Sequence, residues 1–118
     1  MLKFVLPMAL LLGGAAPAWA DAWGAIAIDQ SQPTKEPGYG IGGGDSENEA
    51  KGNALKFCRE SGTVSGCKIM VTYQSCGAIA SNGHDIGWAM APTKKDVEIN
   101  AIKACGKDDC QSVTSDCN

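Results

Sequence analysis

The chain has little of what enzymes and metalloproteins usually depend on. It contains one histidine, His84, and none of its six cysteines is spaced as Cys-x-x-Cys. These two absences exclude the common zinc-ligand spacings and thioredoxin-like redox motifs. Lys and Arg number 10 against 13 Asp and Glu. With no excess of positive charge, the composition does not favour nucleic acid as a partner.

Long apolar runs are also scarce, and the chain has one, near its start. Lys3 precedes an almost wholly apolar stretch at 4–16, and Ala18-Trp19-Ala20 matches an A-x-A cleavage site. A membrane-spanning helix needs about 20 apolar residues, so the run is too short to predict a span. We predict that residues 1–20 are a secretory signal peptide cleaved after Ala20. The alternative is an N-terminal anchor that is never cleaved.

The remaining 98 residues would keep all six cysteines. Cleavage would remove Lys3 and no acidic residue, so the charge balance becomes 9 against 13, or −4. An even number of cysteines in a small exported domain is typical of a disulfide framework in an oxidising compartment. A domain of this size has a thin core, which disulfides would supplement. We therefore expect a periplasmic or secreted protein, with residues 21–118 as a single duplicated domain.

An internal repeat organises this domain. The segment Gly24-Ala25-Ile26-Ala27 recurs as Gly77-Ala78-Ile79-Ala80, an offset of 53, and further along the offset is 47. The difference places six extra residues in the first copy, within a loop at 30–38 that contrasts with a tight Asn-Gly turn at 81–84. We place the first repeat at about 21–75 and the second at about 76–118.

Each copy predicts the order strand, strand, helix, strand. Both helices begin at a capping signal, S-x-x-E from Ser46 and T-x-x-D from Thr93, and Gly62 and Gly106 are plausible stops. Each helix carries one apolar stripe. The predicted strands are 23–28, 39–42 and 67–73, then 77–80, 86–90 and a more polar 110–116. The fold class is α+β: two pseudo-symmetric strand-strand-helix-strand repeats form one disulfide-stapled domain, with both helices on one side of the sheet material.

Six cysteines allow fifteen pairings, and the repeat narrows them. Cys58 and Cys105 occupy the same helical position in the two copies. Cys67 and Cys110 each begin the predicted strand that follows the helix of their copy. The symmetric choice ties each helix end to its next strand and leaves one bridge from the start of the second copy to the end of the chain. The predicted pairs are Cys58–Cys67, Cys105–Cys110 and Cys76–Cys117. A bridge between the two helices would contradict this pairing.

The order of these features resembles a known family. The features are Trp23-Gly-Ala-Ile-Ala27, a helix ending in Cys58, Gly66-Cys67, Cys76-Gly-Ala-Ile-Ala80, a second helix ending in Cys105, then Cys110 and Cys117. Together they resemble the domain-of-unknown-function family 4189 over nearly all of the mature chain. The resemblance implies a small exported bacterial domain that bears cysteines and occurs alone or attached to other domains. That family has no agreed activity, so the resemblance implies no catalytic residues.

Candidate catalytic and metal-binding residues are few. His84 beside Asp85 could serve a hydrolase, but no nucleophile elbow accompanies them, and polar residues are common in such a turn. The acidic pair at 108–109 could hold calcium with Asp116, but the three lack an ordered oxygen-ligand pattern. The glycine run at 40–44 precedes a helix but lacks a phosphate-loop signature. We predict no catalytic residue, no metal and no cofactor.

The remaining notable side chains suggest a binding surface. Tyr39 and Trp88 lie in the second strands, where they either project outward as interface anchors or pack in the core. Lys94 and Lys95 lie in the first turn of the second helix, where the helix dipole disfavours cations. They form either a basic spot for an acidic partner or a solvated face. We favour two surfaces, the loop 30–38 and the hairpin 82–88, and the candidate residues are Tyr39, His84, Asp85, Trp88, Lys94 and Lys95.

These patterns favour a non-enzymatic exported module that binds an envelope or secreted protein, of inhibitor or immunity type by analogy with other small disulfide proteins. We expect no nucleic-acid partner and no membrane span after leader cleavage, and no pattern indicates an oligomeric state. Two alternatives stay open. One is an envelope enzyme, either a hydrolase that uses His84 and Asp85 or a thiol oxidoreductase. The other is a structural protein of the envelope.

Overall fold

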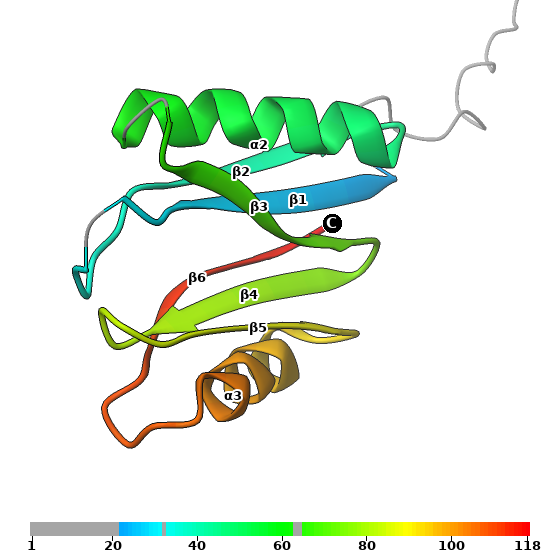
Figure 1. Cartoon of the computed structure of the whole chain (residues 1–118). Coiled ribbons are helices and arrows are strands. Elements are labelled where there is room, and N and C mark those ends of the chain that lie inside the picture. Colours follow the sequence, from blue (N-terminus) through cyan, green and yellow to red (C-terminus); the bar gives the residue numbers. More distant parts are fainter. Residues whose placement is uncertain (1–21, 32, 63–64) are drawn as a thin grey trace, which may run out of the picture.

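The computed structural model describes residues 22–118 except 32 and 63–64, so the predicted signal peptide at 1–20 lies outside the described residues. The order strand, strand, helix, strand occurs twice, as predicted (Figure 1). The elements are β1 (Trp23–Asp29), β2 (Tyr39–Gly44), α2 (Glu47–Ser61), β3 (Cys67–Tyr73), β4 (Cys76–Ser81), β5 (Ile86–Ala91), α3 (Lys94–Cys105) and β6 (Gln111–Cys117). Neither helix of this described part is long and apolar enough to cross a membrane.

Each half of the chain builds one antiparallel three-stranded sheet around its first strand. The strand orders are β2-β1-β3 and β5-β4-β6. In the first sheet Ile26 pairs with Val71, and in the second Ile79 pairs with Thr114. The register shifts directly after each of these isoleucines. The two halves therefore share not only the strand order but also the position of this register shift. This confirms the predicted α+β fold of two similar units.

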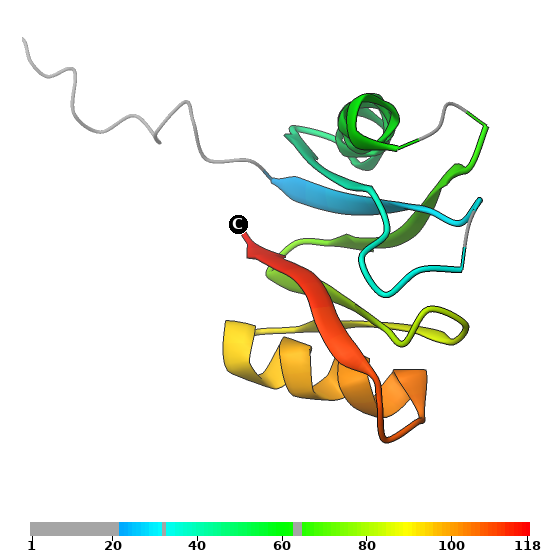
Figure 2. The same ribbon diagram turned by 90° about the vertical axis from the view of Figure 1, so that its left-hand side faces the viewer.

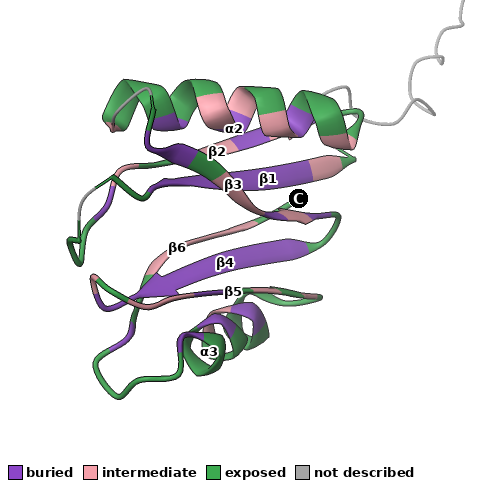
Figure 3. Cartoon of the chain, viewed as in Figure 1, coloured by how far each residue is buried: buried purple, intermediate pink, exposed green. Residues whose placement is uncertain are grey.

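The two sheets stack face to face, and the helices cover their outer faces. In Figure 1, α2 lies over the first sheet and α3 under the second, with both sheets between them. The helices cross, because α2 runs across the view in Figure 1 and is seen end-on in Figure 2, whereas α3 shows the reverse. The expectation that both helices lie on one side was wrong. The central strands β1 and β4 are buried along almost their whole length, so each needs an apolar cover on both faces (Figure 3).

The repeated Gly-Ala-Ile-Ala segment has a different role for each of its side chains. The alanines of β1, Ala25 and Ala27, pack against α2, and those of β4 pack against α3. The isoleucines point the other way, into the core between the sheets. Alternate residues of a strand face opposite sides, so small side chains meet the helices and large ones fill the centre.

The glycines of this segment make room for one tyrosine ring. Tyr73 is 1% exposed, and a Cβ added to Gly24 or Gly77 would lie 2.4 or 2.2 Å from its ring. Its hydroxyl donates a hydrogen bond to Asp116 Oδ2 at 2.7 Å. Tyr73 pairs with Gly24 in the first sheet and Asp116 pairs with Gly77 in the second, so the two partners occupy matching positions.

The helices begin and end where the sequence predicts. The Ser46 hydroxyl accepts a hydrogen bond from the Glu49 amide at 3.1 Å, and Thr93 caps α3 in the same way. Gly62 and Gly106 follow the last helical residues. A Cβ on Gly40 would lie 2.2 Å from the Cys58 amide nitrogen, so this glycine lets α2 approach β2 closely. The glycine run at 40–44 is thus a strand packed beneath a helix rather than a loop.

Three disulfides join the six cysteines, and no cysteine is free. The bridges are Cys58–Cys67, Cys76–Cys117 and Cys105–Cys110, the pairs that the repeat predicts. Two of them tie the last turn of a helix to the start of the next strand, at Cys67 in β3 and at Cys110 directly before β6. The third joins residues that face each other directly in β4 and β6. Such bridges indicate an environment outside the reducing cytoplasm.

Candidate functional site

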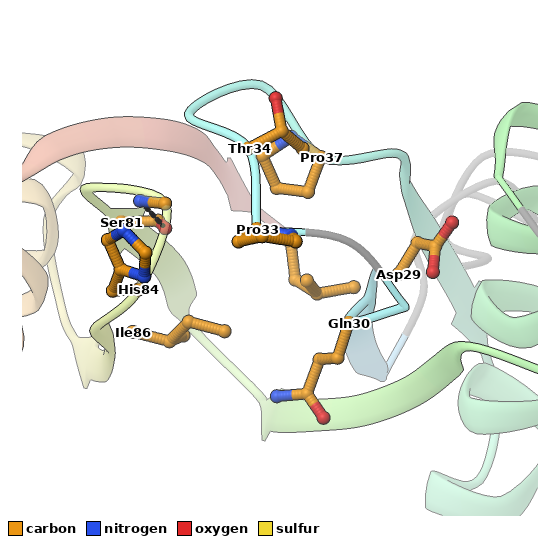
Figure 4. A pocket seen from close by; sticks show the side chains of 10 residues that line it. Asp29, Gln30, Pro33, Thr34, Pro37, Ser81, His84 and Ile86 are labelled. Carbon is orange, nitrogen blue, oxygen red and sulfur yellow. Dashed lines mark hydrogen bonds between the residues drawn. The ribbon is translucent and has the colours of Figure 1, made fainter.

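A pocket of about 290 Å³ lies where the two halves meet at their loop ends (Figure 4). The long loop 30–38 of the first half forms one side, and the turn of the β4–β5 hairpin forms the other. Its walls combine aliphatic and proline side chains with a few polar groups. The lining residues are Ile28, Asp29, Gln30, Pro33, Thr34, Pro37, Ser81, Gly83, His84 and Ile86. The two surfaces favoured by the sequence therefore share one hollow.

The loop 30–38 lies against the hairpin turn of the other half. A Cβ on Gly83, which has a φ of +99°, would lie 3.4 Å from the Thr34 carbonyl carbon and 3.5 Å from the Lys35 nitrogen. At the base of the loop, the Asp29 amide donates to the Gly38 carbonyl at 2.8 Å. The hydrogen bond at its base and the contact with Gly83 position this loop as one wall of the pocket.

A buried asparagine organises the turn. Asn82 is 9% exposed, and its Oδ1 accepts hydrogen bonds from the amides of His84 and Asp85 at 2.8 and 2.7 Å. Its Nδ2 donates to the carboxylates of Asp85 and Asp109 at 3.1 and 3.0 Å. The hydrogen bond from Asn82 lowers the pKa of the Asp109 carboxyl. With its backbone held this way, His84 projects as an exposed side chain at the pocket.

The polar groups of the pocket do not form a catalytic relay. Ser81 is 4% exposed, and its hydroxyl accepts a hydrogen bond from the Gly83 amide at 3.0 Å. Asp85 binds Asn82 and does not line the pocket. Among the residues that the structure describes, the His84 ring is hydrogen-bonded to neither Ser81 nor Asp85. A nucleophile, a base and an orienting acid are therefore not connected as acyl-transfer chemistry requires.

Two exposed apolar side chains continue from the pocket along β5. Ile86, Trp88 and Met90 alternate along this strand and so share one face. Ile86 lines the pocket, whereas Trp88 and Met90 are 48% and 65% exposed. The outward projection of Trp88 is thus an observed feature. We call the pocket lining together with Trp88 and Met90 the loop–hairpin surface.

The other predicted binding residues lie elsewhere. Tyr39 is 40% exposed and lines a second pocket of about 280 Å³ together with the start of β6. Because β6 and β5 are opposite edges of one sheet, Tyr39 is separated from Trp88. Lys94 and Lys95 are exposed after β5, at the far end of the strand from His84. Met90 was missed by sequence reasoning, although its alternation with Trp88 was a usable signal.

No metal centre is found among residues 22–118 as described. No group of three His, Cys, Asp or Glu side chains there could hold a metal ion. Asp109 and Asp116, considered together as calcium ligands, lie before β6 and near its end. Each has its own hydrogen-bond partner, Asn82 for Asp109 and Tyr73 for Asp116.

Comparisons with known proteins agree with this architecture. A family model described as a domain of unknown function, DUF4189, matches residues 23–117. No curated protein matches the chain. The NMR structure of Rv1813c from Mycobacterium tuberculosis is similar, with a TM-score of 0.56 and 23% sequence identity over 96% of this chain and 88% of that chain. At this identity the likeness shows the fold alone.

Proposed function

The chain belongs to the DUF4189 family, which is defined by a domain of unknown function, and from this premise we propose that it is an exported, non-enzymatic module that binds another protein. The binding site is the loop–hairpin surface. The partner is an envelope or secreted protein, which the module restrains as an inhibitor or immunity-type factor. Three disulfides support a location outside the cytoplasm, in the periplasm or the surroundings of the cell.

One observation carries this proposal: a pocket built from both halves lies at one end of β5, and the same face of that strand carries the exposed side chains of Trp88 and Met90. Large apolar side chains beside a pocket are typical anchors of protein interfaces, where a few residues supply most of the binding energy. A side chain of the partner can insert into the pocket, whose volume is about 290 Å³. The Trp88 side chain can in turn insert into the surface of the partner.

The scaffold behind this surface supports the same function. Asn82 holds the turn through four hydrogen bonds, and the loop 30–38 rests on Gly83. These contacts fix the turn and the base of the loop before a partner docks. A preorganised surface binds more tightly because it avoids the entropic cost of ordering loops.

Capture by the immobilised mature protein tests the proposal. Residues 21–118 would be exposed to envelope and culture fractions, and bound proteins would be quantified. We expect one protein at near-equal stoichiometry, with its recovery reduced at least about tenfold by Trp88→Ala, as for a hot-spot residue. Met90→Ala should have a smaller effect in the same direction.

Phe57→Ala is the matched control, because Phe57 is 46% exposed but lies on α2. It should leave recovery unchanged. Equal losses with Trp88→Ala and Phe57→Ala, or the absence of any stoichiometric partner from all fractions, would argue against the loop–hairpin surface as a binding site.

A further inference from the structure

The bridge between Cys76 and Cys117 differs from the other two in access. Cys117 is exposed, whereas the other five cysteines are between 0% and 8% exposed. Reduction of a disulfide starts with attack of a thiolate on one sulfur, so its rate depends on whether a sulfur can be approached. Exposure of the residue Cys117 gives a reductant an approach to this bridge that the other two bridges lack, since both of their cysteines are buried.

This bridge also holds a strand that has no buried residue. None of the seven residues of β6 is buried, and their side chains are mostly polar. Beyond its backbone pairing with β4, the C-terminal half of β6 relies on two side-chain hydrogen bonds, Asp116 with Tyr73 and Ser115 with Glu98. After the strand, Asn118 donates three hydrogen bonds to β3 and the turn that follows it: its backbone amide to the Ser75 carbonyl at 2.9 Å, and its side-chain amide to the Tyr73 and Gln74 carbonyls at 3.4 and 3.3 Å. Cys117 is the covalent attachment at this end of the strand.

We propose that Cys76–Cys117 is a thiol–disulfide exchange site that a dithiol reductant opens in the folded protein before the other two bridges. A thiolate of the reductant attacks Sγ of Cys117, the bond to Cys76 breaks, and Cys76 leaves as a thiolate that takes up a proton. The second thiol of the reductant then attacks the mixed disulfide and releases the Cys117 thiol. The reductant becomes a disulfide, and Cys76 and Cys117 become two thiols.

Opening this bridge loosens β6 from its C-terminal end. The other end stays tied through Cys105–Cys110, whose sulfurs belong to buried residues. The strand that loses its neighbour is β4, which is buried throughout and pairs with β6 on one side. Separation of β6 converts part of this central strand into an unpaired edge, and such an edge is a template for pairing with another strand.

Limited reduction of the intact protein tests the order of opening. The oxidised mature protein would be treated with limiting dithiothreitol without denaturant, trapped with N-ethylmaleimide at intervals and analysed as peptides. We expect label on Cys76 and Cys117 at least about tenfold faster than on the other four cysteines. The rate should rise in proportion to dithiothreitol and be insensitive to low urea. Equal labelling of all three pairs, or a steep urea dependence, would overturn the proposal because reduction would then follow unfolding.

Amide hydrogen exchange tests the consequence for β6. In Cys76→Ser/Cys117→Ser, we expect faster exchange in β6 and in the facing amides of β4, with β1, β2 and β3 still protected. The control Cys58→Ser/Cys67→Ser should leave β6 protected. Unchanged protection of β6 in the first variant would overturn the proposal. If that variant does not fold, the same measurement on wild-type protein trapped after the first reduction decides the question.

Discussion

The two halves adopt the same fold but attach their last strand by different means. In the first half, β3 buries Cys67, Val71 and Tyr73, and one bridge spanning nine residues holds its start. In the second half, β6 buries none of its residues, and bridges hold both of its ends. The two strands nevertheless have the same pairing with their central strands and the same register shift.

This difference indicates that covalent links can replace apolar burial in a given strand position. Burial stabilises the folded state by removing surface from water, whereas a disulfide acts mainly by restricting the unfolded chain. The second half can therefore keep a polar, accessible strand where the first half keeps a buried one. Three predictions test this difference: on the bridges, on one matched pair of side chains, and on the hydrogen bond that joins the halves.

The largest effect should come from removing the bridges. Cys76→Ala/Cys117→Ala opens a loop with a sequence separation of 41 and should lower the free energy of unfolding by about 4 kcal/mol. Cys58→Ala/Cys67→Ala opens a separation of nine and should cost about 2.5 kcal/mol. Urea unfolding followed by circular dichroism measures both. An equal or larger cost for the shorter loop would show that the second half does not depend more on its bridges.

The next effect should come from a matched pair of side chains. Val71, which is 6% exposed, packs between the sheets, and Thr114 occupies the corresponding position of β6. Val71→Ala should cost about 2 kcal/mol because it leaves a cavity, and Thr114→Ala should cost less than about 1 kcal/mol. Thermal and urea unfolding of the two variants provide the values. Similar losses at both positions would mean that β6 is packed as firmly as β3.

The smallest effect concerns the buried Tyr73 hydroxyl, which joins the two halves through Asp116. Burial, followed by the hydrogen bond to Asp116, raises the pKa of the Tyr73 hydroxyl above its ordinary 10.0. Above that pH the unfolded chain releases this proton while the folded chain retains it, so the unfolded state binds fewer protons. Stability should thus be unaffected by this group below pH 10 and fall by about 1.4 kcal/mol per pH unit above it.

Urea unfolding between pH 8 and 11 tests this dependence, with Tyr73→Phe as the variant. The substitution should remove the alkaline loss, whereas Tyr39→Phe, which alters an exposed side chain, should retain it. A steep alkaline loss that persists in Tyr73→Phe would assign the effect to other groups.

Much of the fold was predictable because its signals are local. Ser46 and Thr93 mark the helix starts through contacts three residues away, and the cysteine pairs follow from matching positions of the repeat. The placement of the helices was not predictable in this way. Every residue of Gly-Ala-Ile-Ala is apolar or glycine, so no polar face signals which side of the strand meets a helix. Only the packing of two distant halves distinguishes the alanine face from the isoleucine face.

The candidate site was likewise predictable where its signals are local, and not where it depends on the packing of distant segments. Turn chemistry predicted the hairpin around Gly83 and the exposure of His84 within it. The pocket itself depends on the meeting of the loop 30–38 with a turn about fifty residues later, which no local pattern encodes. The separation of Tyr39 from Trp88 likewise follows from strand order, since the two side chains border opposite edges of the second sheet.

The hydrogen bond from Tyr73 to Asp116 has a consequence for how such a molecule could be assembled. It joins matching positions of two similar units across their shared centre. In a twofold dimer of identical subunits, the same centre would bring two tyrosines or two aspartates together, which means either a clash of rings or a repulsion of charges. A single chain escapes that restriction, since its two units are free to differ. Fusion of the halves thus allows a donor to meet an acceptor, and one ring to fill a space that both units leave open.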